Sequence, residues 1–141
     1  MVATAKVYLF GRDVSAEGVK EKLASANPGS LVQVARAGSV SNELLVEMLA
    51  AQTFRAESAG DMLAKKPEMD LLLRLAGTTQ ISKAIKSQGA VAGEKFLAIN
   101  ADRKELSTPA DFNEAELPRM GLTEADLFRI ERAALLNAQK G

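Results

Sequence analysis

The chain has 141 residues, with 18 basic and 18 acidic side chains and neither cysteine nor histidine. Disulfides, thiolate nucleophiles, cysteine or histidine metal sites and Ser-His-Asp triads are therefore excluded. A chain of this length is most simply one domain, residues 1–141. It shows no basic-then-apolar leader and no apolar run near the ~20 residues that span a bilayer, so we expect a cytoplasmic protein.

The first third of the chain predicts a strand, a helix and a second strand. Residues 6–10 are an apolar run rich in strand formers. Ser15 is a predicted helix N-cap, and apolar residues at helical spacing follow it: Val19, Leu23 and Ala26. Asn27-Pro28-Gly29 ends that helix, and residues 31–35 form the second strand.

The longest predicted helix begins near Ser39 or Ser41. Its face repeats at helical spacing over about five turns: Leu45, Met48, Leu49, Gln52, Ala56, Ala59 and Leu63. Gly60 is a weak point at which the helix kinks or ends early. Pro67 ends it at the latest, because proline disfavours helix at the residue before it.

Residues 70–89 predict two helices joined at a glycine. The first is apolar almost all round, has Asp70 in its first turn and ends at Gly77, which suits a left-handed residue. Thr78 or Thr79 is expected to cap the second helix. That helix has an apolar edge (Ile81, Ala84 and Ile85) and a basic face (Lys83 and Lys86). A third strand is expected at residues 94–99, followed by an exposed turn at 100–104.

The last part of the chain predicts a short helix at 109–119, broken at Pro118, and a C-terminal helix to about Asn137. Thr123 is the N-cap of the latter, with Asp126 three residues on. The elements together predict an α/β (α+β) fold: a small mixed or antiparallel sheet of three to four strands covered by about six helices. The fourth strand would lie between residues 102 and 108.

Signals for catalysis are weak. Asp61, Glu68 and Asp70 are most simply solvated helix ends, because surface acids usually do nothing chemical. The two glycines of residues 89–93 match neither dinucleotide nor P-loop spacing. Asp111, Glu114 and Glu116 lack the glycine turn of a calcium loop. We therefore expect no metal site and no cofactor.

Charge is distributed unevenly along the chain. Residues 71–93 contain no acidic side chain. Residues 65–86 contain five basic ones: Lys65, Lys66, Arg74, Lys83 and Lys86. Seven acids lie between Glu105 and Glu131. These are either two solvated faces, or one surface that seeks anions and one that meets a basic partner. Aromatic content is only 4%, so RNA binding would rest on phosphate contacts.

The C-terminal helix is unusually apolar. Leu127, Ile130, Ala134 and Ala138 form one stripe, which is expected to pack on the sheet. Phe128 and Leu135 form a second stripe about a quarter-turn away. The second stripe is either additional core or an exposed patch for a partner.

One family resemblance rests mainly on residues 53–97. An acidic residue followed by aliphatics (70–77), then Gln80-Ile81, Ala84-Ile85 and a terminating Gly89, resembles the small regulatory subunit of the KEOPS (EKC) complex. The chain departs from the family pattern in two places. The opening acid is often glutamate but here is Asp70, and the residue before the last glycine is often aromatic but here is Gln88.

The resemblance implies a non-catalytic subunit. Family members bind the small lobe of an atypical protein kinase and ATPase, largely through the C-terminal helix, and meet the other subunits through it. They support threonylcarbamoyl modification of adenosine 37 in tRNA, and some bind tRNA, notably its 3′ end. By position, kinase contact falls on Leu127, Ile130, Ala134 and Leu135. The candidates for tRNA phosphate contact, chosen by charge and location, are Arg55, Lys65, Lys66, Lys83 and Lys86.

Two other functions stay open. A stand-alone regulatory domain would bind a small molecule in an apolar pocket between helices and sheet. An enzyme is the weaker alternative, because carboxylates and lysines alone would have to do its chemistry.

Overall fold

The computed structural model describes residues 3–113, 117–119 and 121–140. They form one compact mixed α/β domain. Its strands are β1 (Thr4–Phe10), β2 (Leu31–Arg36) and β3 (Phe96–Asp102), and its helices are α1 (Ala16–Ala26), α2 (Glu43–Ser58), α3 (Pro67–Ala76), α4 (Ile81–Gln88) and α5 (Glu124–Gln139). None of the helices in the described part of the chain is long and apolar enough to cross a membrane.

The sheet is antiparallel and three-stranded, in the order β1-β3-β2. Val7 and Gln33 both lie opposite Ile99, so β1 and β2 run parallel to each other on either side of β3. The connection through α1 therefore skips one strand position, which β3 fills, as in a split β-α-β unit. Because β3 is central and covered on both faces, almost every residue in it is buried. This explains its continuous apolar run.

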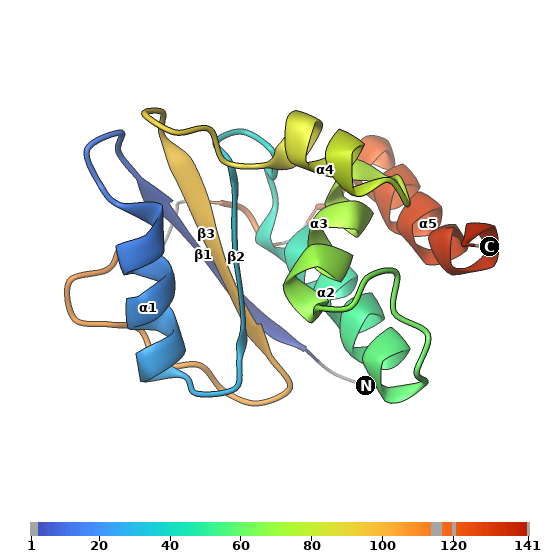
Figure 1. Cartoon of the computed structure of the whole chain (residues 1–141), viewed down its shortest axis with the longest axis horizontal. Helices are drawn as coiled ribbons and strands as arrows, with labels where there is room; N and C mark the ends of the chain where they lie inside the picture. Colours follow the sequence, from blue (N-terminus) through green and yellow to red (C-terminus); the bar gives the residue numbers. More distant parts are fainter. Residues whose placement is uncertain (1–2, 114–116, 120, 141) are drawn as a thin grey trace.

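The helices are divided between the two faces of the sheet, as Figure 1 shows. α1 packs on one face through Val19 and Leu23, which meet Tyr8, Phe96 and Ala98. α2 and α3 cover the other face, where the main core lies, and α4 packs on α3. α5 forms an outermost layer against α2 and α3.

Several predicted helix boundaries are confirmed. Ser15 caps α1, and Thr123 and Asp126 form a capping box at the start of α5, with both bonds at 3.1 Å. Gly77 ends α3 in the left-handed conformation, with φ of 68°. The left-handed backbone is what requires glycine here; a Cβ would lie 2.8 Å from Nε of Arg132 on α5, an exposed side chain that can move aside.

Other boundaries differ from the predictions. The N-cap of α2 is Asn42, whose side chain accepts from Leu44 N–H at 2.9 Å. The predicted early end near Gly60 is confirmed, because α2 ends at Ser58. Gln80 precedes α4 without a side-chain cap. Residues 109–113 and 117–119 form no helix, and the rest of that predicted helix lies outside the described residues. The described part of the chain has five helices and no fourth strand.

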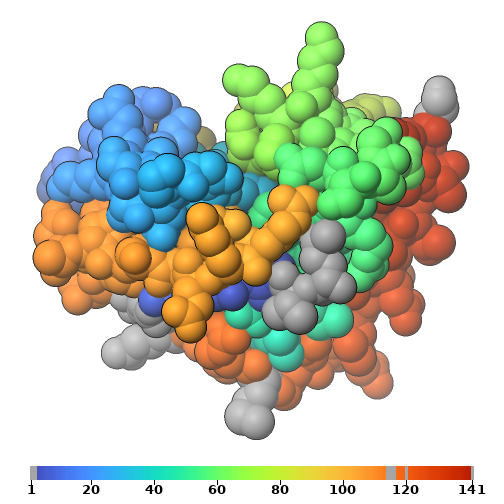
Figure 2. Space-filling model, turned by 90° about the horizontal axis from the view of Figure 1, so that it is seen from below, coloured from blue at the N-terminus to red at the C-terminus, as the bar shows by residue number. Residues whose placement is uncertain are grey.

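The predicted exposed turn at 100–104 is wrong for residues 100–102, which belong to β3. β3 continues to Asp102, and Asn100 is fully buried. Its Nδ2 donates to Leu31 O at 3.0 Å and to Ser30 Oγ at 2.8 Å, while its Oδ1 accepts from Asn27 Nδ2 at 2.9 Å. These bonds satisfy the buried amide. Figure 2 shows the segment after β3, in orange, lying against the blue α1, with green α2 between it and the red α5 at the right-hand margin.

Candidate partner-binding surface

Helix α5 is held on α2 and α3 mainly by polar side chains that donate to backbone carbonyls. Gln52 Nε2 donates to Ile130 O and Arg74 Nη1 donates to Ala133 O, both at 3.0 Å. Arg129 of α5 in turn donates to carbonyls outside α5, to Ser39 O at 3.0 Å and to Leu75 O at 2.9 Å. Burial lowers the pKa of Arg129, but an arginine remains a cation at neutral pH. The pattern fixes both the position and the rotation of α5.

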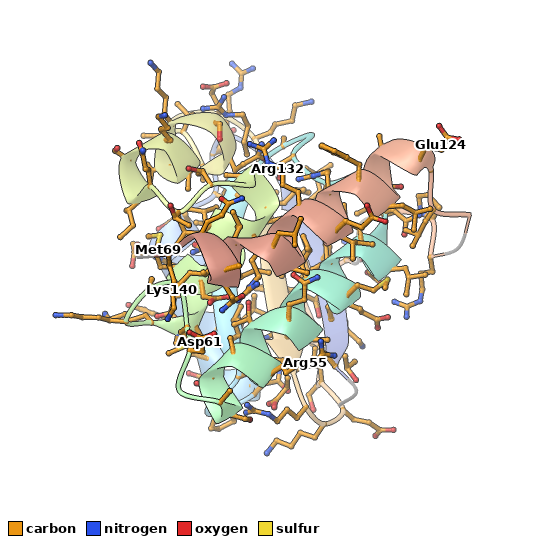
Figure 3. The ribbon with its side chains drawn as sticks, turned by 90° about the vertical axis from the view of Figure 1, so that its right-hand side faces the viewer. Arg55, Asp61, Met69, Glu124, Arg132 and Lys140 are labelled. Atoms are coloured by element: carbon orange, nitrogen blue, oxygen red, sulfur yellow. The ribbon has the colours of Figure 1, made fainter. Side chains whose placement is uncertain are left out.

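The far end of α5 is held by the loop between α2 and α3. Asn137 Nδ2 donates to Asp61 O at 2.6 Å, and Lys140 Nζ lies 2.7 Å from Asp61 Oδ1 (Figure 3). The hydrogen bond from Lys140 holds the pKa of Asp61 below its ordinary value. Gln52 bonds near the middle of α5 and Asp61 near its end, so α2 and α5 run side by side in the same direction.

A buried ion pair supports this attachment. Asp70 and Arg74 are 0% and 1% exposed, with Arg74 Nε 2.6 Å from Asp70 Oδ1 and Arg74 Nη2 3.2 Å from Oδ2. The carboxylate also accepts from Thr53 Oγ1 at 2.5 Å and from Leu63 N–H at 2.9 Å. The pair therefore joins α2, the α2–α3 loop and α3, and through Arg74 it reaches α5. The expectation that Asp70 is a solvated helix end is wrong, and Arg74 does not belong to an exposed basic face.

The outer face of α5 is apolar and open to solvent. Leu127, Phe128 and Leu135 are 47%, 61% and 60% exposed, Ala134 and Ala138 are exposed, and Ile130 is half-buried. The prediction that the stripe of Leu127, Ile130, Ala134 and Ala138 packs on the sheet is wrong. The buried residues of α5 are instead Asp126, Ala133 and Leu136, and they face α2 and α3.

Both apolar stripes of α5 are therefore at the surface, and acidic side chains lie among them. Glu124 and Glu131 are exposed on this outer face, while Arg132 lies at its edge on the α4 side (Figure 3). Phe128 and Arg132 line a small cavity there with Gly77 and Gln88. Phe128, the most exposed large apolar side chain on α5, is absent from the residues carried over by resemblance. Phe128 and Leu135 are seven residues apart and so share a helix face, and this spacing is the sequence signal for a second apolar stripe.

The five candidate RNA-contacting cations are all exposed, but they do not form one cluster. Lys65 and Lys66 lie in the loop before α3, and Lys83 and Lys86 lie on α4, which packs on α3. Gln33 and Arg36 of β2 donate to the carbonyls of Glu68 and Lys86, which brings the start of α3 and the end of α4 to the same strand. Arg55 lies on α2, beside α5 (Figure 3).

A groove, which we call the α2–α5 groove, is lined by residues of both α2 and α5. It consists of two cavities of about 240 and 450 Å³ that share Gln52 and Arg55 in their walls. Met48, Ala51 and Ile130 line the larger one, and Ala59 and Ala134 line the smaller one. Met48 is 38% exposed, although its helical spacing had placed it on a core stripe.

The described part of the chain contains no group of three acidic side chains that could hold a metal ion. Asp111 instead pairs with Lys22 at 2.8 Å, and this contact holds its pKa below the ordinary value. Glu114 and Glu116 lie outside the described residues.

Comparison of the chain with protein-family models gives no match, and comparison with curated proteins gives none either. The surfaces of the molecule and the motif of residues 70–89 are therefore the basis for its proposed function.

Proposed function

We propose that this chain is the non-catalytic, kinase-binding subunit of a KEOPS-type complex that modifies tRNA with threonylcarbamoyladenosine. The observation that carries the proposal is the outer face of α5, where Leu127, Phe128 and Leu135 remain about half exposed or more. Three large apolar side chains on one helix face are typical of a docking surface. The family that the 70–89 motif resembles uses this same helix to bind its kinase.

The helix is well suited to docking because it is already ordered. Its capping box, its polar bonds to α2 and α3 and the Lys140–Asp61 pair fix its position without a partner. Binding then costs little conformational entropy, and the exposed apolar area contributes more of its free energy to affinity. The remaining subunits would be met through the kinase.

A tRNA contact is the second part of the proposal. Lys65, Lys66, Lys83 and Lys86 lie on the α3–α4 side of the molecule, in a stretch free of acidic residues from 71 to 93. Among the described residues, none of the four forms an ion pair, so their charges are available to phosphates. This surface is distinct from the outer face of α5, so kinase and tRNA would bind together.

Affinity purification of the tagged chain from its source cell tests the proposal. We expect a protein kinase and an ATPase-fold tRNA-modifying subunit to be identified by mass spectrometry. Leu135→Glu should abolish recovery of the kinase, since a charge in a desolvated interface is costly. Leu9→Glu is the matched control, because Leu9 is 52% exposed on β1 and outside this surface. A tightly bound metabolite with no kinase would favour the stand-alone regulatory domain and refute the proposal.

A further inference from the structure

We infer that the α2–α5 groove receives one amphipathic helix of the kinase partner, and that Arg55 binds a carboxylate on that helix. The inference rests on the proposed function and adds a second contact of the partner, next to the outer face of α5. It also assigns Arg55 to the protein interface rather than to the tRNA surface. Its basis is a groove of suitable length, with walls that no segment of the described chain covers.

The shape of the groove fits a helix. Met48, Ala51, Arg55 and Ala59 follow one another along α2 at spacings of three and four, so they share one face. From Met48 to Ala59 that face is roughly 16 Å long, which is three turns of a helix. On the opposite wall, Ile130 and Ala134 of α5, four residues apart, line the groove. Alanines on both walls let a helix approach closely, and Met48 and Ile130 supply larger apolar contacts.

The stripe on α5 points to a missing partner. Leu127, Ile130, Ala134 and Ala138 have the periodicity of a buried helix face, yet this chain leaves the stripe largely open. The chain uses polar donors from Gln52 and Arg74 to hold α5, which leaves the apolar stripe free for another surface. A helix in the groove would give the stripe the environment that its sequence predicts.

The charges of the groove specify the chemistry of that helix. Glu47 is bound by Arg119 at 2.8 Å, and Asp61 is bound by Lys140 at 2.7 Å. Arg55 is exposed and, within the described part of the chain, forms no ion pair. It lines both cavities, so it lies at their junction. An arginine in this position favours a partner carboxylate, which it can bind through two hydrogen bonds.

A nucleic acid fits the groove less well. Its walls contain alanine, leucine, methionine and isoleucine beside polar residues such as Gln52 and Asn137. Of its two arginines, Arg74 is buried against Asp70, and only Arg55 is exposed. Phosphate binding to nucleic acid draws on several lysines or arginines along the backbone. The four lysines that meet this description lie on the α3–α4 side, away from Arg55.

The test compares two alanines on the same helix. Ala134 lines the groove and Ala125 does not, and both are exposed. Binding of the purified kinase subunit is measured by calorimetry for Ala134→Trp, Ala125→Trp and Arg55→Glu, with thermal melting as the folding control. We expect Ala134→Trp and Arg55→Glu each to weaken kinase binding about tenfold or more, while Ala125→Trp stays near wild type. Binding of tRNA by Arg55→Glu should equal that of wild type.

The possible results separate the two proposals. If wild type binds no kinase, the proposed function fails and the groove inference fails with it. If wild type binds but Ala134→Trp and Arg55→Glu bind equally well, only the groove inference is refuted. If Arg55→Glu loses tRNA binding and keeps kinase binding, Arg55 belongs to the RNA surface and the inference is wrong.

Discussion

Two neighbouring leucines on α5 should respond to truncation in opposite ways. Leu136 is 1% exposed and packs against α2 and α3, whereas Leu135 is 60% exposed on the outer face. Replacing a buried leucine by alanine costs about 2–5 kcal/mol of folding free energy, because it removes apolar burial and leaves a cavity. Leu136→Ala should therefore lower the free energy of unfolding by about that amount.

Leu135→Ala should leave stability almost unchanged and weaken kinase binding instead. Full burial of a leucine side chain is worth about 1.5–3 kcal/mol, and some 60% of this one remains for a partner to cover, or about 1–2 kcal/mol. That free energy corresponds to a loss of affinity of roughly five- to thirtyfold.

Urea unfolding and calorimetric titration with the kinase subunit measure both quantities on the same preparations. Equal destabilisation by Leu135→Ala and Leu136→Ala would contradict the placement of Leu135 on an exposed face. Wild-type affinity of Leu135→Ala for the kinase would contradict its place in the interface.

Three further predictions concern the ion pairs and the basic surface. Arg74→Met should lower the free energy of unfolding by about 3–5 kcal/mol in urea titrations, because it leaves the buried Asp70 carboxylate without its cation. A loss below ~1 kcal/mol would contradict a stabilising role for the Asp70–Arg74 pair. The pKa of Asp61 is lowered in the folded state, so its pair with Lys140 stabilises the fold above the ordinary value of 3.8 and that contribution is lost as the pH falls below it. The melting temperatures of wild type and Asp61→Asn should therefore differ at neutral pH and converge in acid, and a constant difference would contradict the assignment. Lys83→Ala and Lys86→Ala should each reduce the slope of log K for tRNA against log salt by about 0.7–0.9, and unchanged slopes would remove these lysines from the RNA surface.

Local signals in the sequence predict much of the fold. Ser15, Gly77 and Thr123 act through their own backbone and near neighbours, so a short window of sequence is enough to place the helix ends. The apolar runs at 31–35 and 96–99 identify β2 and most of β3, since the sheet is covered on both faces, but they miss the end of β3 at residues 100–102. The sheet order and the split crossover depend on long-range pairing, which such windows do not contain.

The errors come from polar groups that the fold buries. Asp70 and Arg74 are four residues apart on a helix, which is also the spacing of an exposed ion pair, so the sequence does not distinguish the two cases. Asn100 resembles a turn residue, yet it ends in the interior because Asn27 and Ser30 from distant segments satisfy its amide. In both cases the partners that make burial favourable lie far away in the chain.

The candidate surface was predicted only in part. Leu127 and Leu135 are exposed as a partner-binding role requires, but periodicity had assigned Leu127 to the stripe that packs on the sheet. The actual buried face of α5 carries Asp126 and Ala133, which an apolar pattern does not reveal. Arg55 was grouped with the lysines by charge, and only the packing of α2 beside α5 separates it from them.

A calorimetric titration of this chain with the purified kinase subunit, for wild type and for the double variant Leu127→Glu/Leu135→Glu, examines the docking surface itself. Both side chains are at least 47% exposed, so the variant should keep the melting temperature of wild type. We predict a one-to-one complex for wild type and a loss of affinity of about a hundredfold or more for the variant, because two carboxylates would enter a desolvated interface. Equal affinities, with both proteins folded, would contradict a kinase-binding role for α5.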